Sequence, residues 1–109
     1  MATIRKHCKS YKIQSNTSPN TQAGNADIVC YDGGGNNLGS LHFDENGFQQ
    51  GSGGYINNGR IEMFFHFRSL AGVIDILRNE GPCDLVIDTV SHLGYVTSGI
   101  ELVGEGETP

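Results

Sequence analysis

The side chains best suited to proton transfer or metal binding in this sequence are its four histidines. Imidazole has the ordinary pKa closest to neutral pH and is the commonest metal ligand. His7, His42 and His66 fall within segments that we expect to be strands, so a curved sheet could bring them together. No pair of histidines has the i, i+2 or i, i+4 spacing that marks a metal site on a strand or a helix. We therefore expect no metal and no cofactor.

Other patterns of catalytic residues are missing from the sequence. Gly33-Gly34-Gly35 lacks the Lys-Ser/Thr pair and the following helix of a phosphate-binding loop. No G-x-S-x-G elbow is present. Cys83 follows a predicted helix stop, whereas reactive cysteines often lie at a helix N-terminus. These absences favour a non-catalytic protein over an enzyme, with a small enzyme that has a His- and Asp-lined pocket as an alternative.

The charge balance argues against nucleic acid as a partner. The chain of 109 residues carries 12 acidic and 7 basic side chains, a net charge of −5, whereas a nucleic-acid surface needs clustered Lys and Arg. Four of the 7 basic residues nevertheless lie in the first twelve positions. Such a strand is typical of a protected sheet edge, since lysines discourage pairing with another chain. A basic docking strip for an anion is the alternative.

Compartment and thiol state follow from what the first residues and the cysteines show. No run of about 20 apolar residues predicts a membrane span, and residues 1–13 have no apolar core of a signal peptide. The cysteines are odd in number and have no CxxC spacing: Cys8, Cys30 and Cys83. We therefore expect a cytoplasmic protein, no membrane partner, and three thiols in the native state.

The elements that position these side chains are organised around residues 60–82. Alternation of period two predicts a strand whose apolar face meets the core; that face carries Ile61, Met63, Phe65 and Phe67. The period then changes to i, i+3, i+4, i+7, which predicts a helix over Ser69–Glu80, with an apolar stripe of Leu70, Val73, Ile74 and Leu77. We expect Ser69 to be the N-cap, and Gly81 with Pro82 to end the helix.

Shorter strands and turns are expected on both sides of this unit. Residues 27–31 and 38–43 predict one hairpin, with its turn at 32–37, and residues 84–90 and 94–103 predict another. Residues 3–13 predict one strand, residues 14–25 a loop, and residues 48–59 a flap or short strand that ends in an Asn58-Gly59 turn. The 109 residues form one domain: a soft N-terminal strand and loop (1–25), a core (26–103) and a frayed acidic tail (104–109).

Together these elements predict an α+β fold. We expect a strongly bent, mostly antiparallel sheet of five or six strands, with one helix packed on one face of it.

Three segments resemble a group of short, uncharacterised bacterial proteins of the kind encoded on mobile integron gene cassettes. They are I-D-x-L-R-N-E-G-P at residues 74–82, G-Y-x-T-x-G at 94–99 and V-G-E-x-E at 103–107. The resemblance covers residues 26–107. The matching segments are turn and helix-end signals and not catalytic motifs, so the resemblance implies no activity and no functional residue.

The function that we expect is binding of a small ligand or a partner by a non-catalytic module. A bent sheet with a helix on one face leaves an opposite concave surface, and apolar walls with a few polar tips are typical of ligand pockets. The residues that we expect to line it are Tyr55, Phe64, His66, Tyr95 and His42. A homo-oligomeric structural or interaction protein is the alternative.

We also expect a homodimer. Phe64 lies opposite the face that the helix covers, and either Val86 with Val90 or Leu85 with Ile87 must point the same way. A monomer of this size would rarely expose such an apolar patch. A sheet that curls into a barrel could bury the patch within one chain, or two copies could pair across it. The low apolar content, 37%, favours pairing.

Overall fold

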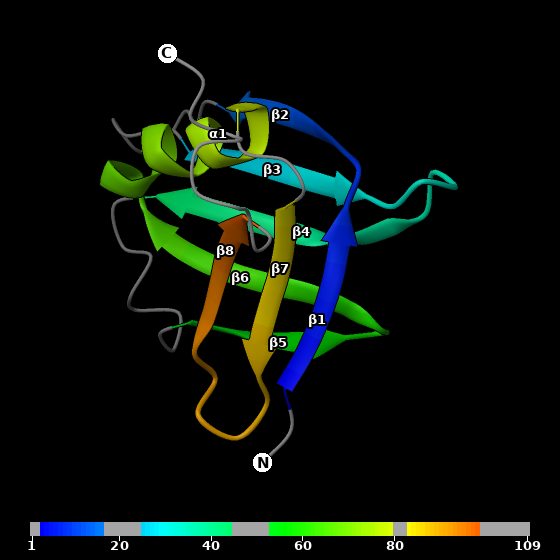
Figure 1. The fold of residues 1–109 in the computed structure, drawn as a ribbon. Helices are drawn as coiled ribbons and strands as arrows, with labels where there is room; N and C mark the ends of the chain where they lie inside the picture. Colours follow the sequence, from blue (N-terminus) through cyan, green and yellow to red (C-terminus); the bar gives the residue numbers. More distant parts are fainter. Residues whose placement is uncertain (1–2, 17–24, 45–52, 80–82, 99–109) are drawn as a thin grey trace, which may run out of the picture.

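The computed structural model describes residues 3–16, 25–44, 53–79 and 83–98. Within these ranges eight strands form two sheets that lie over one another with steeply crossed strands, and a helix lies at one end (Figure 1). The chain is therefore α+β and mostly antiparallel, as predicted. The prediction of one strongly bent sheet is wrong, because two sheets are present and neither is strongly curled.

The smaller sheet has the strand order β1-β7-β8, and the larger sheet has the order β2-β3-β4-β6-β5. Neighbouring strands are antiparallel except β4 and β6, which are parallel. A 3₁₀ turn at Phe67–Ser69 leads directly into the helix α1 (Leu70–Asn79). The strands are β1 (Thr3–Cys8), β2 (Ser10–Asn16), β3 (Asn25–Tyr31), β4 (Asn37–Asp44), β5 (Gly53–Asn57), β6 (Arg60–His66), β7 (Cys83–Asp88) and β8 (Gly94–Ser98).

The single N-terminal strand predicted over residues 3–13 is in fact two strands, one in each sheet. The chain leaves the small sheet after Cys8 and enters the large sheet at Ser10. Between them, the Lys9 N–H donates to the Tyr31 carbonyl at 2.8 Å, which anchors the crossing on β3. Strands that switch sheets form the corners of orthogonally packed sheets, so this crossing joins the two layers covalently.

The core lies between the two sheets and closes within one chain. Leu85 and Ile87 belong to the same buried cluster as Met63, and β8 approaches so closely that a Cβ on Gly94 would lie 2.8 Å from the Met63 Sδ. Of the two pairs expected to share a patch with Phe64, Leu85 with Ile87 is therefore excluded. The largest fully buried side chains are Phe43, Ile28, Leu41, Ile61, Met63, Leu85, Ile87, Val86 and Cys30.

The helix closes one end of this core and contacts β8 (Figure 1). Val73 is buried, and the other three residues of the predicted stripe pack against the core cluster. The helix ends at Asn79, close to the predicted end, while residues 80–82 lie outside the described ranges. Ser69 is not the N-cap. It is the last residue of the 3₁₀ turn, and the His66 side chain caps that turn by accepting from the Arg68 N–H.

The predicted hairpins and one turn are confirmed. β3 pairs with β4 and β7 pairs with β8, both antiparallel. Asn58 and Gly59 join β5 to β6 with φ values of 54° and 79°, as a tight hairpin turn requires. Of the flap or short strand predicted over residues 48–59, the short strand is present, as Gly53–Asn57. The predicted loop is strand at residues 14–16 and 25. Residues 17–24, 48–52 and 99–109 lie outside the described ranges.

No helix among the described residues is long and apolar enough to cross a membrane.

Candidate functional site

A histidine held between two carboxylates lies on the face of the large sheet that points away from the core. Asp27, His42 and Glu62 come from β3, β4 and β6, which are neighbours in the sheet. His42 Nδ1 lies 2.7 Å from Asp27 Oδ1, and Nε2 lies 2.7 Å from Glu62 Oε1. Asp27 is directly opposite His42 in the β3–β4 register, so the hairpin itself sets the first of these contacts.

The two carboxylates determine the charge of this histidine. Burial opposes the charged form and is the largest single effect on His42, but the hydrogen bonds to Glu62 and then Asp27 outweigh it, so the pKa of His42 is raised. With both ring nitrogens facing carboxylate oxygens, the imidazolium can donate two charge-assisted hydrogen bonds. The group of three then carries one net negative charge.

An aromatic row extends from this histidine across the sheet. The Phe64 ring lies between the other two rings, 4.9 Å from that of His42 and 5.8 Å from that of Tyr55, measured between centroids. Both pairs are stacked, with interplanar angles of 23° and 21°. Three of the five predicted site residues are therefore in one row.

The other two predicted site residues lie elsewhere. His66 is farther along β6, where its Nδ1 accepts from the Arg68 N–H at 3.1 Å. Tyr95 is on the small sheet, opposite Val86 in the β7–β8 register. His7 is also on the small sheet, so the convergence of His7, His42 and His66 that a single curved sheet would allow does not occur.

A cavity of about 280 Å³ lies beside the aromatic row. It is bounded on one side by β5 and β6 and on the other by the turn between β7 and β8. Its walls are mostly apolar, and the lining residues are Gly53, Phe64, Phe65, Ser91, His92, Leu93 and Gly94. The cavity therefore lies where an edge of the large sheet meets the end of the small one.

Hydrogen bonds between His92 and Gly54 hold the cavity's two sides together. The Gly54 N–H donates to the His92 carbonyl at 2.9 Å, and His92 Nδ1 lies 3.1 Å from the Gly54 carbonyl oxygen. His92 has a positive φ of 63°, which few non-glycine residues adopt. Gly53 has a φ of 89°, and a Cβ there would overlap the His92 carbonyl. The site therefore depends on glycine at position 53.

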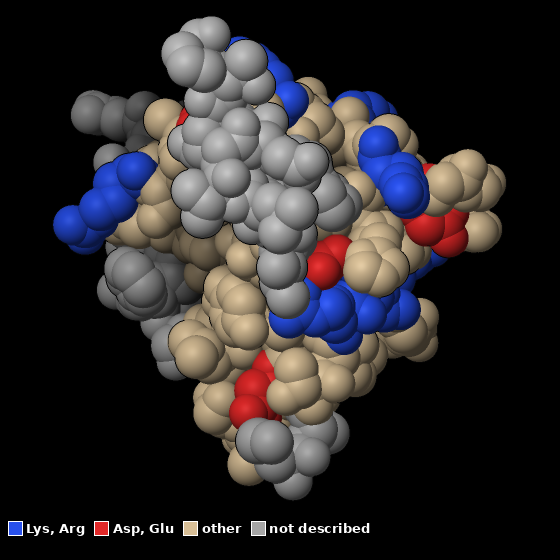
Figure 2. All heavy atoms as spheres, in the orientation of Figure 1, with Lys and Arg blue, Asp and Glu red and all other residues tan. Residues whose placement is uncertain are grey.

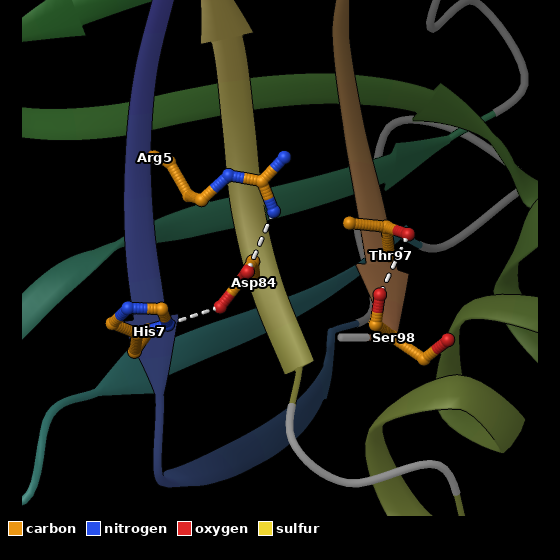
Figure 3. Close-up of polar contacts among 5 residues, drawn as sticks. All are labelled: Arg5, His7, Asp84, Thr97 and Ser98. Carbon is orange, nitrogen blue, oxygen red and sulfur yellow. Dashed lines mark hydrogen bonds and ion pairs between the residues drawn. The ribbon is translucent and has the colours of Figure 1, made fainter. Parts of the chain in front are cut away.

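A second polar cluster, which no pattern in the sequence predicts, lies on the outer face of the small sheet (Figure 3). Asp84 of β7 has a side chain that is only 5% exposed, and both of its carboxylate oxygens have partners on β1. Arg5 Nη1 donates to Oδ2 at 2.6 Å, and His7 Nδ1 is hydrogen-bonded to Oδ1. The nearby Thr97 hydroxyl donates to the Ser98 carbonyl at 3.0 Å and does not join the cluster.

These partners explain how a carboxylate can be buried on this face. Burial is the largest single effect on Asp84 and opposes its ionisation, but the hydrogen bonds from Arg5 and His7 outweigh it, so the pKa of Asp84 is lowered. The same contacts pin β1 to β7 across the sheet. In Figure 2, which views this side of the molecule, basic and acidic side chains lie next to one another and do not separate into large patches.

The described residues hold no group of three His, Cys, Asp or Glu side chains arranged to bind a metal ion. Comparison of the chain with known protein families, curated proteins and solved structures finds no match. The candidate site therefore rests on its own geometry.

Proposed function

We propose that this protein binds a small, largely apolar molecule in the cavity beside Phe64. One observation carries the proposal, a cavity of about 280 Å³. Its walls include Phe64, Phe65 and Leu93, and its lining also includes the exposed residues Ser91 and His92. Small-molecule sites are mostly apolar with few polar groups, and their volumes start at roughly 300 Å³. This volume suits a ligand of about one ring.

The charged histidine supports the site by holding one wall in place. Phe64 stacks on His42, and His42 is fixed by carboxylates on both of its ring nitrogens. A wall that does not need to be ordered on binding lowers the entropic cost of association. We therefore assign Asp27, His42 and Glu62 a positioning role for Phe64 and not a chemical one.

Binding without catalysis fits the lining of the cavity better than an enzyme does. Among the described lining residues the only ionisable side chain is His92, whose Nδ1 lies 3.1 Å from the Gly54 carbonyl oxygen. General acid–base chemistry needs a titratable group within hydrogen-bonding reach of the substrate, and it usually needs a second group to orient the first. No carboxylate lines this part of the described structure.

A fragment screen by nuclear magnetic resonance tests the proposal. Single-ring apolar fragments should shift the amide signals of residues 53, 64–65 and 91–94. Leu93→Glu should abolish those shifts, because it places a charge on the apolar wall. Val90→Glu is the matched control, since Val90 is 66% exposed, Leu93 is 63% exposed, and Val90 does not line the cavity. Shifts that cluster elsewhere, or equal loss in both variants, would refute the proposal.

A homodimer that pairs through the outer face of the large sheet is a second candidate. Leu85 and Ile87 add nothing to such an interface, because they belong to the core of one chain. What favours the dimer is Tyr55, which is 43% exposed and lies beside Phe64. Light scattering at tens of micromolar should then give twice the monomer mass of 11.7 kDa, and Phe64→Glu should restore the monomer. A monomeric wild-type protein would exclude it.

A further inference from the structure

All three cysteines of the chain converge where β1 crosses from one sheet to the other. Cys8 is the last residue of β1 and lies directly opposite Cys83 of β7 in the antiparallel register. The next residue, Lys9, donates its N–H to the carbonyl of Tyr31, the residue after Cys30. The crossing therefore brings Cys8 of the small sheet beside Cys30 of the large sheet. All three side chains are thiols and not disulfides.

The three thiols have different surroundings. Cys30 is fully buried, and Cys8 is the group with the largest effect on the pKa of its thiol. The Cys83 thiol is turned toward the helix, where it donates to the Ile76 carbonyl at 3.1 Å. Cys8 is only partly buried, and its Sγ lies 3.3 Å from the Ser10 carbonyl oxygen. Cys8 is thus the thiol that a small solute can reach.

The interaction between Cys8 and Cys30 shifts the pKa values of the two thiols in opposite directions. The hydrogen bond from Cys30 is the largest effect on Cys8 and outweighs burial, so the pKa of Cys8 is lowered to about 7. The same hydrogen bond, followed by burial, raises the pKa of Cys30. The thiolate is the reactive form of cysteine. At neutral pH Cys8 therefore supplies a nucleophile, and Cys30 holds a proton beside it.

We propose that Cys8 is a site of oxidation by hydrogen peroxide and that Cys30 resolves it to a disulfide joining the two sheets. The Cys8 thiolate attacks one peroxide oxygen. An S–O bond forms, the O–O bond breaks, and hydroxide leaves and takes up a proton to become water. The Cys30 sulfur then attacks the sulfur of the Cys8 sulfenic acid. The S–S bond forms, the S–O bond breaks, and the oxygen leaves as a second water. Two thiols are oxidised and one peroxide is reduced.

The second step favours Cys30 over Cys83 for two reasons. Cys8 and Cys30 have the largest effect on each other's pKa, as two neighbouring thiols do, whereas the Cys83 thiol donates to the Ile76 carbonyl. Sulfenic acid is also uncharged, so oxidation of Cys8 removes the thiolate whose hydrogen bond holds the proton on Cys30. The first oxidation thereby makes the resolving thiol easier to ionise.

Mass spectrometry of the full chain tests this inference. The reduced protein is treated with one equivalent of hydrogen peroxide, unfolded and alkylated without reductant. The product should lack the mass of two hydrogen atoms and should carry alkylation on Cys83 alone. Trypsin places the cysteines in three different peptides, residues 7–9, 13–60 and 79–109, so the linked pair is read directly. A link from 7–9 to 13–60 is expected.

Three variants separate the roles. Cys83→Ser is the matched control and should oxidise like the wild type, whereas Cys8→Ser should form no intramolecular disulfide. Cys30→Ser should stop at a Cys8 sulfenic acid that dimedone traps, and Cys30→Ala repeats the measurement if circular dichroism shows that the serine variant is unfolded. A wild-type link between Cys8 and Cys83, a link between chains only, or a Cys8 that stays reduced would each overturn the inference.

Discussion

Raising the pH should weaken the folded protein through His42. Because the folded-state pKa of His42 is raised, its stabilisation is fully present below the unfolded value of about 6.5 and is lost as the pH rises through the folded value. The charged ring donates to both Asp27 and Glu62, at 2.7 Å each. The neutral ring keeps one N–H, so deprotonation removes one of the two hydrogen bonds.

The size of this loss follows from the geometry. A hydrogen bond to a charged group contributes about 1.5–3 kcal/mol net. The side chains of His42 and Asp27 are 33% and 31% exposed, so water competes for the contact. We therefore expect about 1–2 kcal/mol between pH 5.5 and 8.5, near the lower end of that range. For a domain of this length that is roughly 5–10 °C in the midpoint of thermal unfolding.

Cys8 must be removed from the measurement, because it acts in the opposite direction. Its pKa is lowered to about 7 in the folded protein, from 9.0, so it adds stability as the pH rises between those values. The comparison is best made by urea unfolding of Cys8→Ser with and without His42→Asn. Asparagine keeps an amide donor but does not titrate, and the other three histidines are common to both proteins.

The expected result is a loss of about 1–2 kcal/mol in the protein that retains His42 and a markedly smaller loss in its His42→Asn partner. Equal pH dependence in the two proteins would show that the two carboxylates do not stabilise the imidazolium. A protein with His42 whose stability rises over this range would refute the argument outright.

Three further predictions concern the glycine at the cavity, the buried carboxylate and the core. Gly53→Ala should lower the free energy of unfolding by more than about 1–2 kcal/mol, the usual penalty for positive φ, because the new Cβ also overlaps the His92 carbonyl. Gly72→Ala, on open helix surface, should instead raise the free energy of unfolding by about 1 kcal/mol, as measured by urea unfolding. The pKa of Asp84 is lowered, so the stability that its charge contributes is lost as the pH falls through the folded-state pKa. Asp84→Asn should therefore reduce the fall in stability below about pH 4, and an unchanged pH dependence there would contradict this. Leu85→Ala should cost about 2–5 kcal/mol, because Leu85 is fully buried between the sheets, and a loss below about 1 kcal/mol would disprove that packing.

The N-terminal strands show where sequence patterns mislead. Residues 3–13 alternate poorly because the core-facing positions change parity at the crossing between sheets. Ile4 and Cys8 face the core on even positions, and Tyr11 packs against it on an odd one. A break in alternation within a run of strand-forming residues was thus the signal for a switch of sheets.

The sequence of β7 does not predict the second sheet, for a related reason. Its residues Cys83–Ile87 are all buried, including Asp84 and Val86 on the outer face, so burial alone does not show which side meets the core. One strand buried on both faces can fit several arrangements. The choice depends on pairing with β1, which lies about eighty positions earlier in the chain, as the register of Thr3 with Asp88 shows. Local pattern cannot supply such a pairing.

The contact between His42 and Asp27 could be predicted more easily from the sequence. A symmetric hairpin closed at residues 32–37 puts Tyr31 opposite Leu38 and therefore Asp27 opposite His42. The structure has Asp27 opposite His42, with a register shift only beside the turn. Glu62 could not be found in this way, because β6 pairs with β4 in parallel and no short turn sets that register. The cavity was equally hidden, since it forms between elements of different sheets.

The pairing of β1 with β7 also constrains the order in which the chain can fold during synthesis. The strands β2 to β6 of the large sheet all precede β7 in the chain, and among the described strands β1 pairs only with β7. Until β7 has emerged, the first strand is therefore unpaired, and unpaired strand edges are prone to join the wrong chain. Arg5 and Lys6 put positive charge on this unpaired strand, which discourages pairing with another chain. In the finished fold Arg5 pairs with Asp84, and Lys6 donates to the Gly59 carbonyl. The two basic residues that discourage wrong pairing of the unpaired strand thus hold β1 in place in the folded protein.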